Sequence, residues 1–293
     1  MEKAETHRAG EAAGPDRTRR ATLGALGVLG ALGPAALLGC GGGEEDAASA
    51  SSAASGSDTS TGSGTTTTTT TSGTCTTIAE ETAGPYPADG SNTNSGSTVN
   101  VLTSTGIVRS DIRANIDGTN TRSGLPLTLT ISLVGSRNGC AALAGYAIYI
   151  WHCDINGEYS AYSVSNNGSH SGESYLRGVQ VTDNAGQVSF TTIYPGCYVP
   201  RAPHIHVEVY PNASAITSSA NKVATSQFAF PDAVSTAVYA TSAYASAGNA
   251  TRRGSVTNAN DQVFSDGTST EMLTLSGDAT SGYAATITVP VAV

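Results

Sequence analysis

The stretch Thr191–Tyr210, TTIYPGCYVPRAPHIHVEVY, decides how this chain is interpreted. It ends in HIHVEV, whose alternation is typical of a β-strand, so His204 and His206 share one face. The apolar residues between and after them, beginning with Ile205, take the other face and predict a core contact. Tyr198 precedes the strand in a turn marked by proline and glycine. Two imidazoles and a phenol this close in sequence predict part of a metal site.

The histidine pair alone is weak evidence for a metal. Most His-x-His pairs on strands are partly buried imidazoles with ordinary hydrogen-bond partners. The chain has only five histidines, and two of them lie here. The case for a metal site therefore has to come from the rest of the chain.

Residues 1–40 are typical of an export signal. Arg19 and Arg20 precede an apolar run that ends in Leu-Leu-Gly-Cys40. The residues TRRATL (18–23) resemble a twin-arginine signal, and Leu-Leu-Gly-Cys resembles a bacterial lipobox. The alternative is a single membrane anchor, but Pro34 and several glycines make this run a poor spanning helix. We expect export by the twin-arginine route and a lipid anchor on Cys40, at the cell envelope or outside the cell.

Composition divides the remainder into a tether and a folding unit. Residues 41–74 are mostly Gly, Ser, Thr and Ala, with an unbroken run of threonine at 65–71, and predict a disordered low-complexity linker. Residues 75–293 are long enough to bury one core and form one domain. The formal net charge is −9, and no basic patch is present, which excludes nucleic acid as an expected partner. We expect contact with a membrane only through Cys40.

Four further cysteines, Cys75, Cys140, Cys153 and Cys197, permit two disulfides in an exported chain. Three pairings are possible, and the sequence does not choose among them. Zinc binding by the four thiols is less favoured, because no pair has the short spacing of a zinc motif.

Short β-rich segments separated by turns predict an all-β sandwich. An Ala-rich stretch, 232–247, predicts a short helix. We expect a hairpin joining 179–182 to 187–193 across an Asp-Asn-Ala-Gly turn. The other expected strands span 99–108, 125–134, 146–153, 204–209, 272–275 and 283–293.

Four ordered elements extend the evidence beyond the histidine pair: WHCDINGEY (151–159), TIYPGCY (192–198), RAPHIH (201–206) and QFAFP (227–231). In this order they resemble the intradiol ring-cleavage dioxygenases, the family of catechol 1,2-dioxygenase and protocatechuate 3,4-dioxygenase. The lead-in ETAGPY (81–86) resembles that family too, and WHCD with YLRGVQ (175–180) is closest to its exported bacterial branch. The resemblance implies a β-sandwich of the intradiol type over residues 75–293.

The resemblance also implies a mononuclear, non-haem Fe(III) held by Tyr159, Tyr198, His204 and His206. Phenolate is a hard anionic oxygen donor that suits ferric iron. Two phenolates and a hydroxide offset three positive charges, so the centre can lie in a partly apolar pocket. By analogy with the family, Tyr198 and His206 are axial ligands, and Tyr159 and His204 are equatorial.

The implied reaction cleaves a catechol-type diol with O₂ between its hydroxylated carbons, giving a muconate-type diacid. The substrate diol is implied to displace Tyr198, which takes up a phenolic proton. Arg201 is implied to stabilise the charge that develops on the attacked ring carbon, and Gln227 to orient Arg201. Tyr86 is a candidate for lining the pocket.

Two other interpretations of the sequence remain open. The chain could be a non-enzymatic exported β-sandwich lipoprotein that binds a small ligand. Alternatively His204, His206 and Glu208 could form a zinc or Fe(II) triad, although alternate residues on a flat strand splay apart. His152 is expected to be structural, while Tyr162 and Tyr175 are substitute ligands if the loop register differs. The sequence decides neither the particular catechol nor the oligomeric state, nor the role of 236–293.

Overall fold

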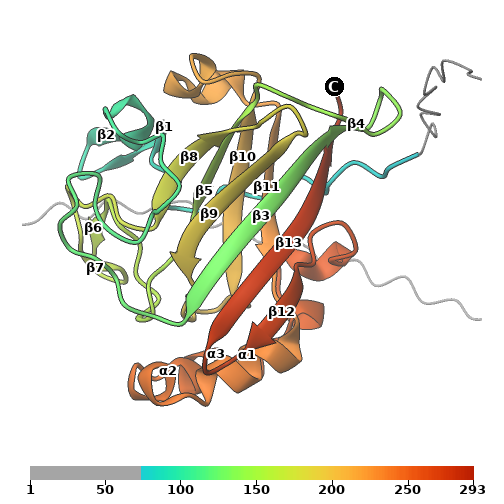
Figure 1. Cartoon of the computed structure of the whole chain (residues 1–293). Helices are drawn as coiled ribbons and strands as arrows, with labels where there is room; N and C mark the ends of the chain where they lie inside the picture. The colour runs from blue at the N-terminus through green and yellow to red at the C-terminus, as the bar shows by residue number, and fades with distance from the viewer. Residues whose placement is uncertain (1–73) are drawn as a thin grey trace, which may run out of the picture. The chain divides into compact units, whose positions relative to one another are not determined.

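The computed structural model describes residues 74–293 and consists mainly of β-strands (Figure 1). The expected export signal, lipobox and most of the linker lie outside the described residues. None of the helices in 74–293 is long and apolar enough to cross a membrane. The expected all-β sandwich is confirmed, with one four-stranded and one five-stranded sheet.

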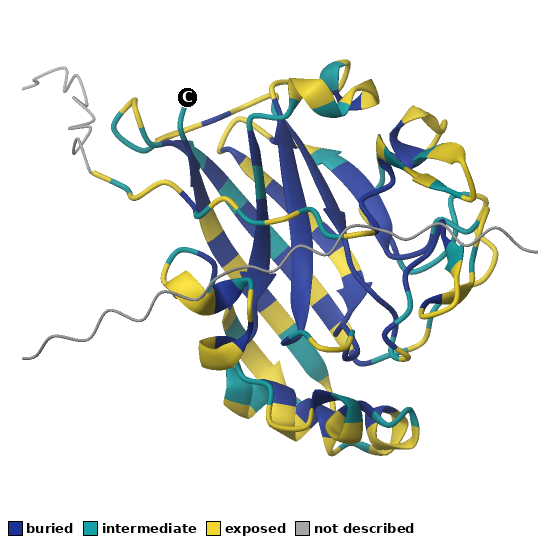
Figure 2. Ribbon diagram, turned by 180° about the vertical axis from the view of Figure 1, so that it is seen from behind, coloured by how far each residue is buried: buried dark blue, intermediate teal, exposed yellow. Residues whose placement is uncertain are grey.

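The four-stranded sheet has the order β11 (Ala224–Ala229), β10 (His204–Tyr210), β5 (Ala147–Trp151) and β8 (Arg177–Val181). All of its neighbouring strands are antiparallel. β10, the strand expected from HIHVEV, lies in the middle of the sheet, and every one of its residues is buried. Figure 2 shows these strands as a continuous dark blue group. A central strand places its side chains accurately, because hydrogen bonds on both edges fix its register.

The facing sheet contains β12 (Thr274–Asp278), β13 (Gly282–Val291), β3 (Pro126–Gly135) and β4 (Ala141–Ala142), with β9 (Gln187–Ile193) also paired to β3. β3 and β13 run parallel to each other. The alternating leucines and isoleucines of β3 point into the space between the sheets, as the sequence predicts. There they meet Ile205, Val207 and Val209 of β10 in one core.

Shorter elements surround the sandwich. Two small hairpins lie beside β8, on the left in Figure 1: β1 (Asp89–Asn94) with β2 (Ser97–Asn100), and β6 (Ser163–Val164) with β7 (Gly168–Ser169). The 3₁₀ turns are η1 (Val101–Thr103), η2 (Ala215–Thr217), η3 (Ser219–Asn221), η4 (Asn258–Asn260) and η5 (Phe264–Asp266). The Ala-rich segment forms helices α1 (Asp232–Tyr239) and α2 (Ser242–Ser246), followed by α3 (Asn249–Arg253), at one end of the sandwich.

Two expectations about strands are wrong. The hairpin across 183–186 does not form, because β8 pairs with β5 in one sheet whereas β9 pairs with β3 in the other. The tight turn is present, with the Gly186 amide donating to the Asp183 carbonyl at 2.9 Å, but it joins the two sheets at a corner. The strand expected over 99–108 ends at Asn100, whose side chain caps the Leu102 amide at 3.0 Å and starts η1.

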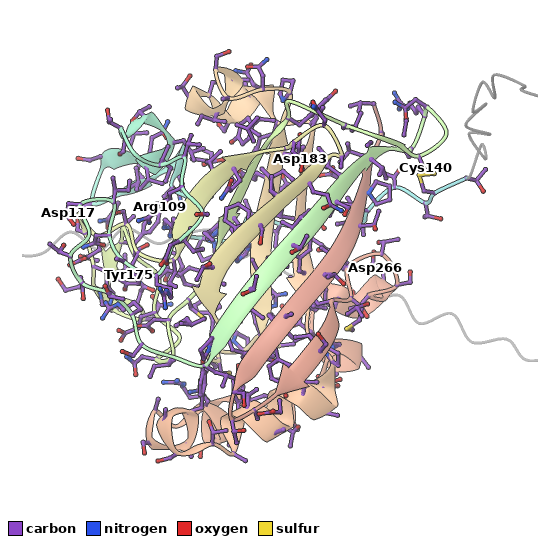
Figure 3. The ribbon with its side chains drawn as sticks, in the orientation of Figure 1. Arg109, Asp117, Cys140, Tyr175, Asp183 and Asp266 are labelled. Carbon is purple, nitrogen blue, oxygen red and sulfur yellow. A yellow bond between two sulfur atoms is a disulfide. The ribbon has the colours of Figure 1, made fainter. Side chains whose placement is uncertain are left out.

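The cysteines form one disulfide and not two among the described residues. Cys75 pairs with Cys140, which is labelled in Figure 3 beside the yellow sulfur atoms. The bond ties the first described residues to the loop that follows β3. Cys153 and Cys197 are buried free thiols. The thiol of Cys153 lies 3.3 Å from the Gly196 carbonyl, beside the turn that carries Tyr198.

The packing of this turn can be tested by substitution at Gly157. Gly157 has a φ of +78°, and a Cβ there would lie 2.2 Å from the Cys197 carbonyl oxygen. Gly145 has a similar φ of +81°, but nothing lies within 4 Å of its Cβ position. We expect Gly145→Ala to cost about 1 kcal/mol, the left-handed backbone penalty alone. Gly157→Ala should cost at least ~2 kcal/mol more, because it adds a backbone clash. Urea unfolding of both variants measures the difference, and equal losses would show that the Cys197 loop yields freely.

Candidate metal centre

The histidine pair lies on the face of the four-stranded sheet that points away from the sandwich core. In the strand register His206 lies opposite Trp151 of β5 and Gln227 of β11. The indole of Trp151 stacks on the His206 imidazole, with ring centroids 4.7 Å apart and planes 2° from parallel. Both histidines are 3% exposed, so they are held almost without solvent.

Three donor atoms from two separate parts of the sequence converge here. The Tyr159 hydroxyl lies 3.2 Å from His204 Nε2 and 3.3 Å from His206 Nε2, and the two Nε2 atoms are 3.1 Å apart. Ligand atoms bound at about 2.0–2.1 Å to one small ion are separated from each other by about 3.0–3.4 Å. The arrangement of these three atoms therefore fits a single first-row metal ion.

The protonation of the imidazoles also fits metal binding. His204 Nδ1 donates to the Ala202 carbonyl at 2.7 Å, which leaves the Nε2 lone pair free. Burial, reinforced by the nearby Arg201 charge, lowers the pKa of His204 to about 3. Burial followed by the neighbouring His204 lowers the pKa of His206 well below its usual value. Both rings are therefore neutral at physiological pH, the form in which imidazole binds metals.

Tyr159 completes the set of donor atoms only as a phenolate anion, and its buried surroundings disfavour that negative charge. Burial, with Cys153 nearby, raises the pKa of its phenol well above the usual value, although Arg201 acts in the opposite direction. A cation bound between Tyr159 and the histidines would reverse this balance, because a metal is the largest local charge in such a site. The donor chemistry thus fits a hard, highly charged ion.

Buried polar side chains hold the Tyr159 loop in place. Asn167 accepts from the Tyr159 amide at 2.7 Å and donates to the Tyr159 carbonyl at 2.8 Å. Arg177, fully buried, donates to the Ser160 hydroxyl at 2.8 Å and to the Ser160 carbonyl at 2.9 Å. The sequence did not point to a role for Asn167 or Arg177. The one signal for Arg177 was its place in the YLRGVQ motif, two residues before the strand expected from 179.

Tyr198 lies beside Tyr159, on the turn that precedes β10. Its ring is half-buried and meets the Tyr159 ring edge-on, with centroids 5.4 Å apart. The amide of Cys197 is held by the side chain of Asn249 in α3 at 2.6 Å, and the Val199–Pro200 peptide is cis. A cavity of about 390 Å³ opens beside Tyr198, lined by Asn156, Gly157, Glu158, Asn166, Cys197, Tyr198, Val199 and Arg252. Tyr198 is therefore the expected ligand with most access to small molecules.

Tyr86 lies among the same aromatic rings, as the resemblance implies. Its ring centroid is 5.2 Å from that of Tyr159 and 5.9 Å from that of Tyr198. Its hydroxyl donates to Asn166 at 3.2 Å. Burial and the neighbouring Tyr198 raise the pKa of Tyr86 to about 12, so this phenol stays protonated. Next to it, Gly84 packs so closely that a Cβ would lie 3.2 Å from His206 Cε1.

Arg201 and Gln227, expected to act together, are in contact. The guanidinium donates through Nη2 to the Gln227 side-chain oxygen at 2.8 Å, and Gln227 in turn donates to the Thr82 carbonyl at 2.7 Å. Arg201 Nε also donates to both oxygens of Asp261, at 2.8 and 2.9 Å. No motif in the sequence points to Asp261, which belongs to the stretch 236–293 whose role was undecided.

The remaining candidates make other contacts. His152 Nδ1 bonds the Cys153 carbonyl at 2.8 Å and its Nε2 meets the Thr192 hydroxyl at 2.7 Å, so it is structural, as expected. The Tyr162 hydroxyl donates a hydrogen bond to the Asn92 side-chain oxygen at 2.6 Å. Arg122 lies over the ring of Tyr175, 3.9 Å from its centroid. Neither tyrosine replaces Tyr159 in contact with the histidine pair.

The alternative of a metal-binding triad formed by His204, His206 and Glu208 is not supported. Its carboxylate is bound by Lys222 at 2.9 Å and by the Tyr210 hydroxyl at 2.8 Å. Across residues 74–293, no group of three or more His, Cys, Asp and Glu side chains is arranged to hold a metal. A metal at the histidine pair therefore has to draw on the tyrosines.

Comparison with known proteins gives a family match and structural neighbours. A family model described as "Dioxygenase" matches residues 104–223. No curated protein matches the chain. An intradiol ring-cleavage dioxygenase from Tetranychus urticae is 24% identical with a TM-score of 0.57, covering 74% of this chain and 95% of its own. A dioxygenase domain from Streptomyces sp. SirexAA-E is 21% identical with a TM-score of 0.45, covering 73% of this chain and 97% of its own.

The family match spans Tyr159, Tyr198 and both histidines, and the similarity to the Tetranychus protein shows that the fold is shared. These findings do not favour the alternative of a non-enzymatic β-sandwich lipoprotein that binds a small ligand. The resemblance inferred from the four sequence elements is thereby confirmed at the level of the fold, which is that of the intradiol ring-cleavage dioxygenases.

Proposed function

We propose that this protein is a non-haem Fe(III) dioxygenase that cleaves a catechol-type diol with O₂ between its hydroxylated carbons, giving a muconate-type diacid. The observation that supports it best is the meeting of the Tyr159 hydroxyl with the Nε2 atoms of His204 and His206 within 3.3 Å. In this proposal Tyr198 is the fourth protein ligand. Fe(III), when bound, supplies Lewis-acid and electron-accepting chemistry toward the diol.

The chain's own groups account for binding and proton transfer. Tyr198 is the ligand beside the open cavity, so its phenolate oxygen is the proposed acceptor for one proton of the incoming diol. Tyr86, whose pKa of about 12 keeps it protonated, stays a hydrogen-bond donor to Asn166 beside Tyr198. Tyr159 and both histidines, almost fully buried, keep solvent away from the inner side of the centre.

Arg201 is the proposed stabiliser of negative charge on the ring under attack. A fixed guanidinium assists most when its orientation is set before the charge develops. Gln227, at 2.8 Å from Nη2, is one of the groups that set this orientation.

The setting of the enzyme is proposed from residues outside the described part. We infer export by the twin-arginine route and a lipid anchor at Cys40, with residues 41–74 as the linker to the domain. The partners are then a small aromatic diol and O₂. Oxygen uptake measured with catechol, protocatechuate, hydroxyquinol and chlorinated catechols would identify the ring substituents that the enzyme accepts.

Iron loading tests the ligand chemistry directly. We expect protein with one Fe(III) per chain to be burgundy, because tyrosinate donates charge to ferric iron in a broad visible band. A strong chelator should remove both the band and the oxygen uptake, and added Fe(III) should restore both. Zinc-loaded protein serves as the colourless, inactive control. A colourless protein with a full complement of iron would contradict the tyrosinate assignment.

Removing the Tyr198 hydroxyl tests whether Tyr198 is a metal ligand or contributes only to folding. Tyr198→Phe should weaken the visible band partly and slow turnover about 100-fold or more, because a proton acceptor and an anionic ligand are both lost. Tyr283→Phe is the matched control, since Tyr283 lies against the sandwich core and its ring faces Tyr194, away from the centre. Visible spectra and oxygen-uptake rates of both variants provide the comparison. Unchanged colour and rate in Tyr198→Phe would show that Tyr198 is not a ligand.

A further inference from the structure

We propose that Asp261 is a positioning residue for this reaction, which fixes the orientation of the Arg201 guanidinium at the metal centre. The inference rests on the proposed function and adds to it a residue 60 positions away in the sequence. Asp261 lies between η4 and η5, beyond the residues 104–223 that the family model matches. The observation that carries it is a buried carboxylate bound to Arg201 through both oxygens.

Asp261 is itself held rigidly. Its side chain is fully buried, and the Ala202 amide donates to it at 2.6 Å and the Val263 amide at 2.8 Å. Ala202 is also the residue whose carbonyl accepts from His204 Nδ1. One carboxylate therefore fixes the guanidinium and the backbone that orients a proposed ligand.

The two partners of Arg201 leave one part of the guanidinium available. Nε is bound to Asp261 and Nη2 to Gln227, whereas Nη1 makes no hydrogen bond to residues 74–293. Nη1 is also not among the buried unpartnered polar atoms of these residues, so it is open to solvent. The planar fork of arginine then presents a single free amino group, in a fixed direction.

Without Asp261 the guanidinium has competing partners. The carboxyls of Glu81 and Glu271 both lie within electrostatic range of Arg201. The Phe264 ring supports the guanidinium only loosely, with its centroid 5.4 Å from Cζ. Loss of the Asp261 charge would therefore free Arg201 to turn toward the glutamates. Gln227 alone provides one hydrogen bond from the cation to an uncharged oxygen, which is weaker than the pair with the Asp261 carboxylate.

The first test uses metal-free protein and does not depend on activity. The ¹⁵N–¹H resonance of Arg201 Nε, assigned by its absence in Arg201→Gln, should exchange slowly with water in the wild type. Asp261→Asn should shift the resonance and accelerate exchange at least 10-fold. Asp232→Asn is the matched control, because it breaks an Asp–Arg pair with Arg253 in the same C-terminal stretch, away from the centre. An unchanged Arg201 resonance in Asp261→Asn would overturn the proposal.

The second test is a double-mutant cycle on the iron-loaded enzyme. Asp261→Asn should lower kcat about 10- to 100-fold and change KM less than about threefold, while leaving the visible band intact. In an Arg201→Gln background the same substitution should change kcat less than about twofold, because the asparagine oxygen still accepts from the Ala202 amide and the lost negative charge acts on Arg201. An equal loss in both backgrounds would overturn the proposal and leave the dioxygenase assignment standing. An iron-loaded wild type that cleaves no catechol would instead overturn the proposed function itself.

Discussion

The centre depends on burying two neutral imidazoles against a phenol, with three polar atoms 3.1–3.3 Å apart. Polar atoms brought this close without water are costly unless each is oriented and satisfied. The surrounding structure provides the orientation: the Ala202 carbonyl fixes His204, and the stacked Trp151 fixes the plane of His206. In the proposed function, a bound metal ion would satisfy the remaining lone pairs.

The position of this cluster follows from the sandwich. β10 is central in its sheet, so one face of the strand belongs to the core and the other is free for chemistry. Ile205 and Val207 hold the strand in the core. The neighbouring His204 and His206 are therefore held rigidly as well. The loops that carry Tyr159 and Tyr198 close over the outer face. Each loop is pinned by buried side chains, Arg177 for the first and Asn249 for the second.

The sequence predicted those features that depend on local periodicity and on ordered motifs. The alternation of HIHVEV determined which residues of β10 face the core, and Arg201 and Gln227 were expected together and are in contact. It could not predict contacts made by tertiary packing. Asp261 has no spacing relation to Arg201, and the turn at 183–186 has the same residues whether its strands pair or diverge into two sheets. The choice of Cys75 with Cys140 likewise required the fold.

The centre also depends on the C-terminal stretch, which contains none of the proposed ligands. All four proposed ligands lie within 104–223, the span of the family model, yet two of their supports come from beyond it. Asn249 holds the Cys197 amide beside Tyr198, and Asp261 holds Arg201 and the Ala202 amide beside His204. Buried hydrogen bonds of this kind are formed only once both partners are folded in place. The ligand geometry therefore depends on the folding of the stretch from α3 to η5, and this part of the chain is a component of the site and not only a cover for the end of the sandwich.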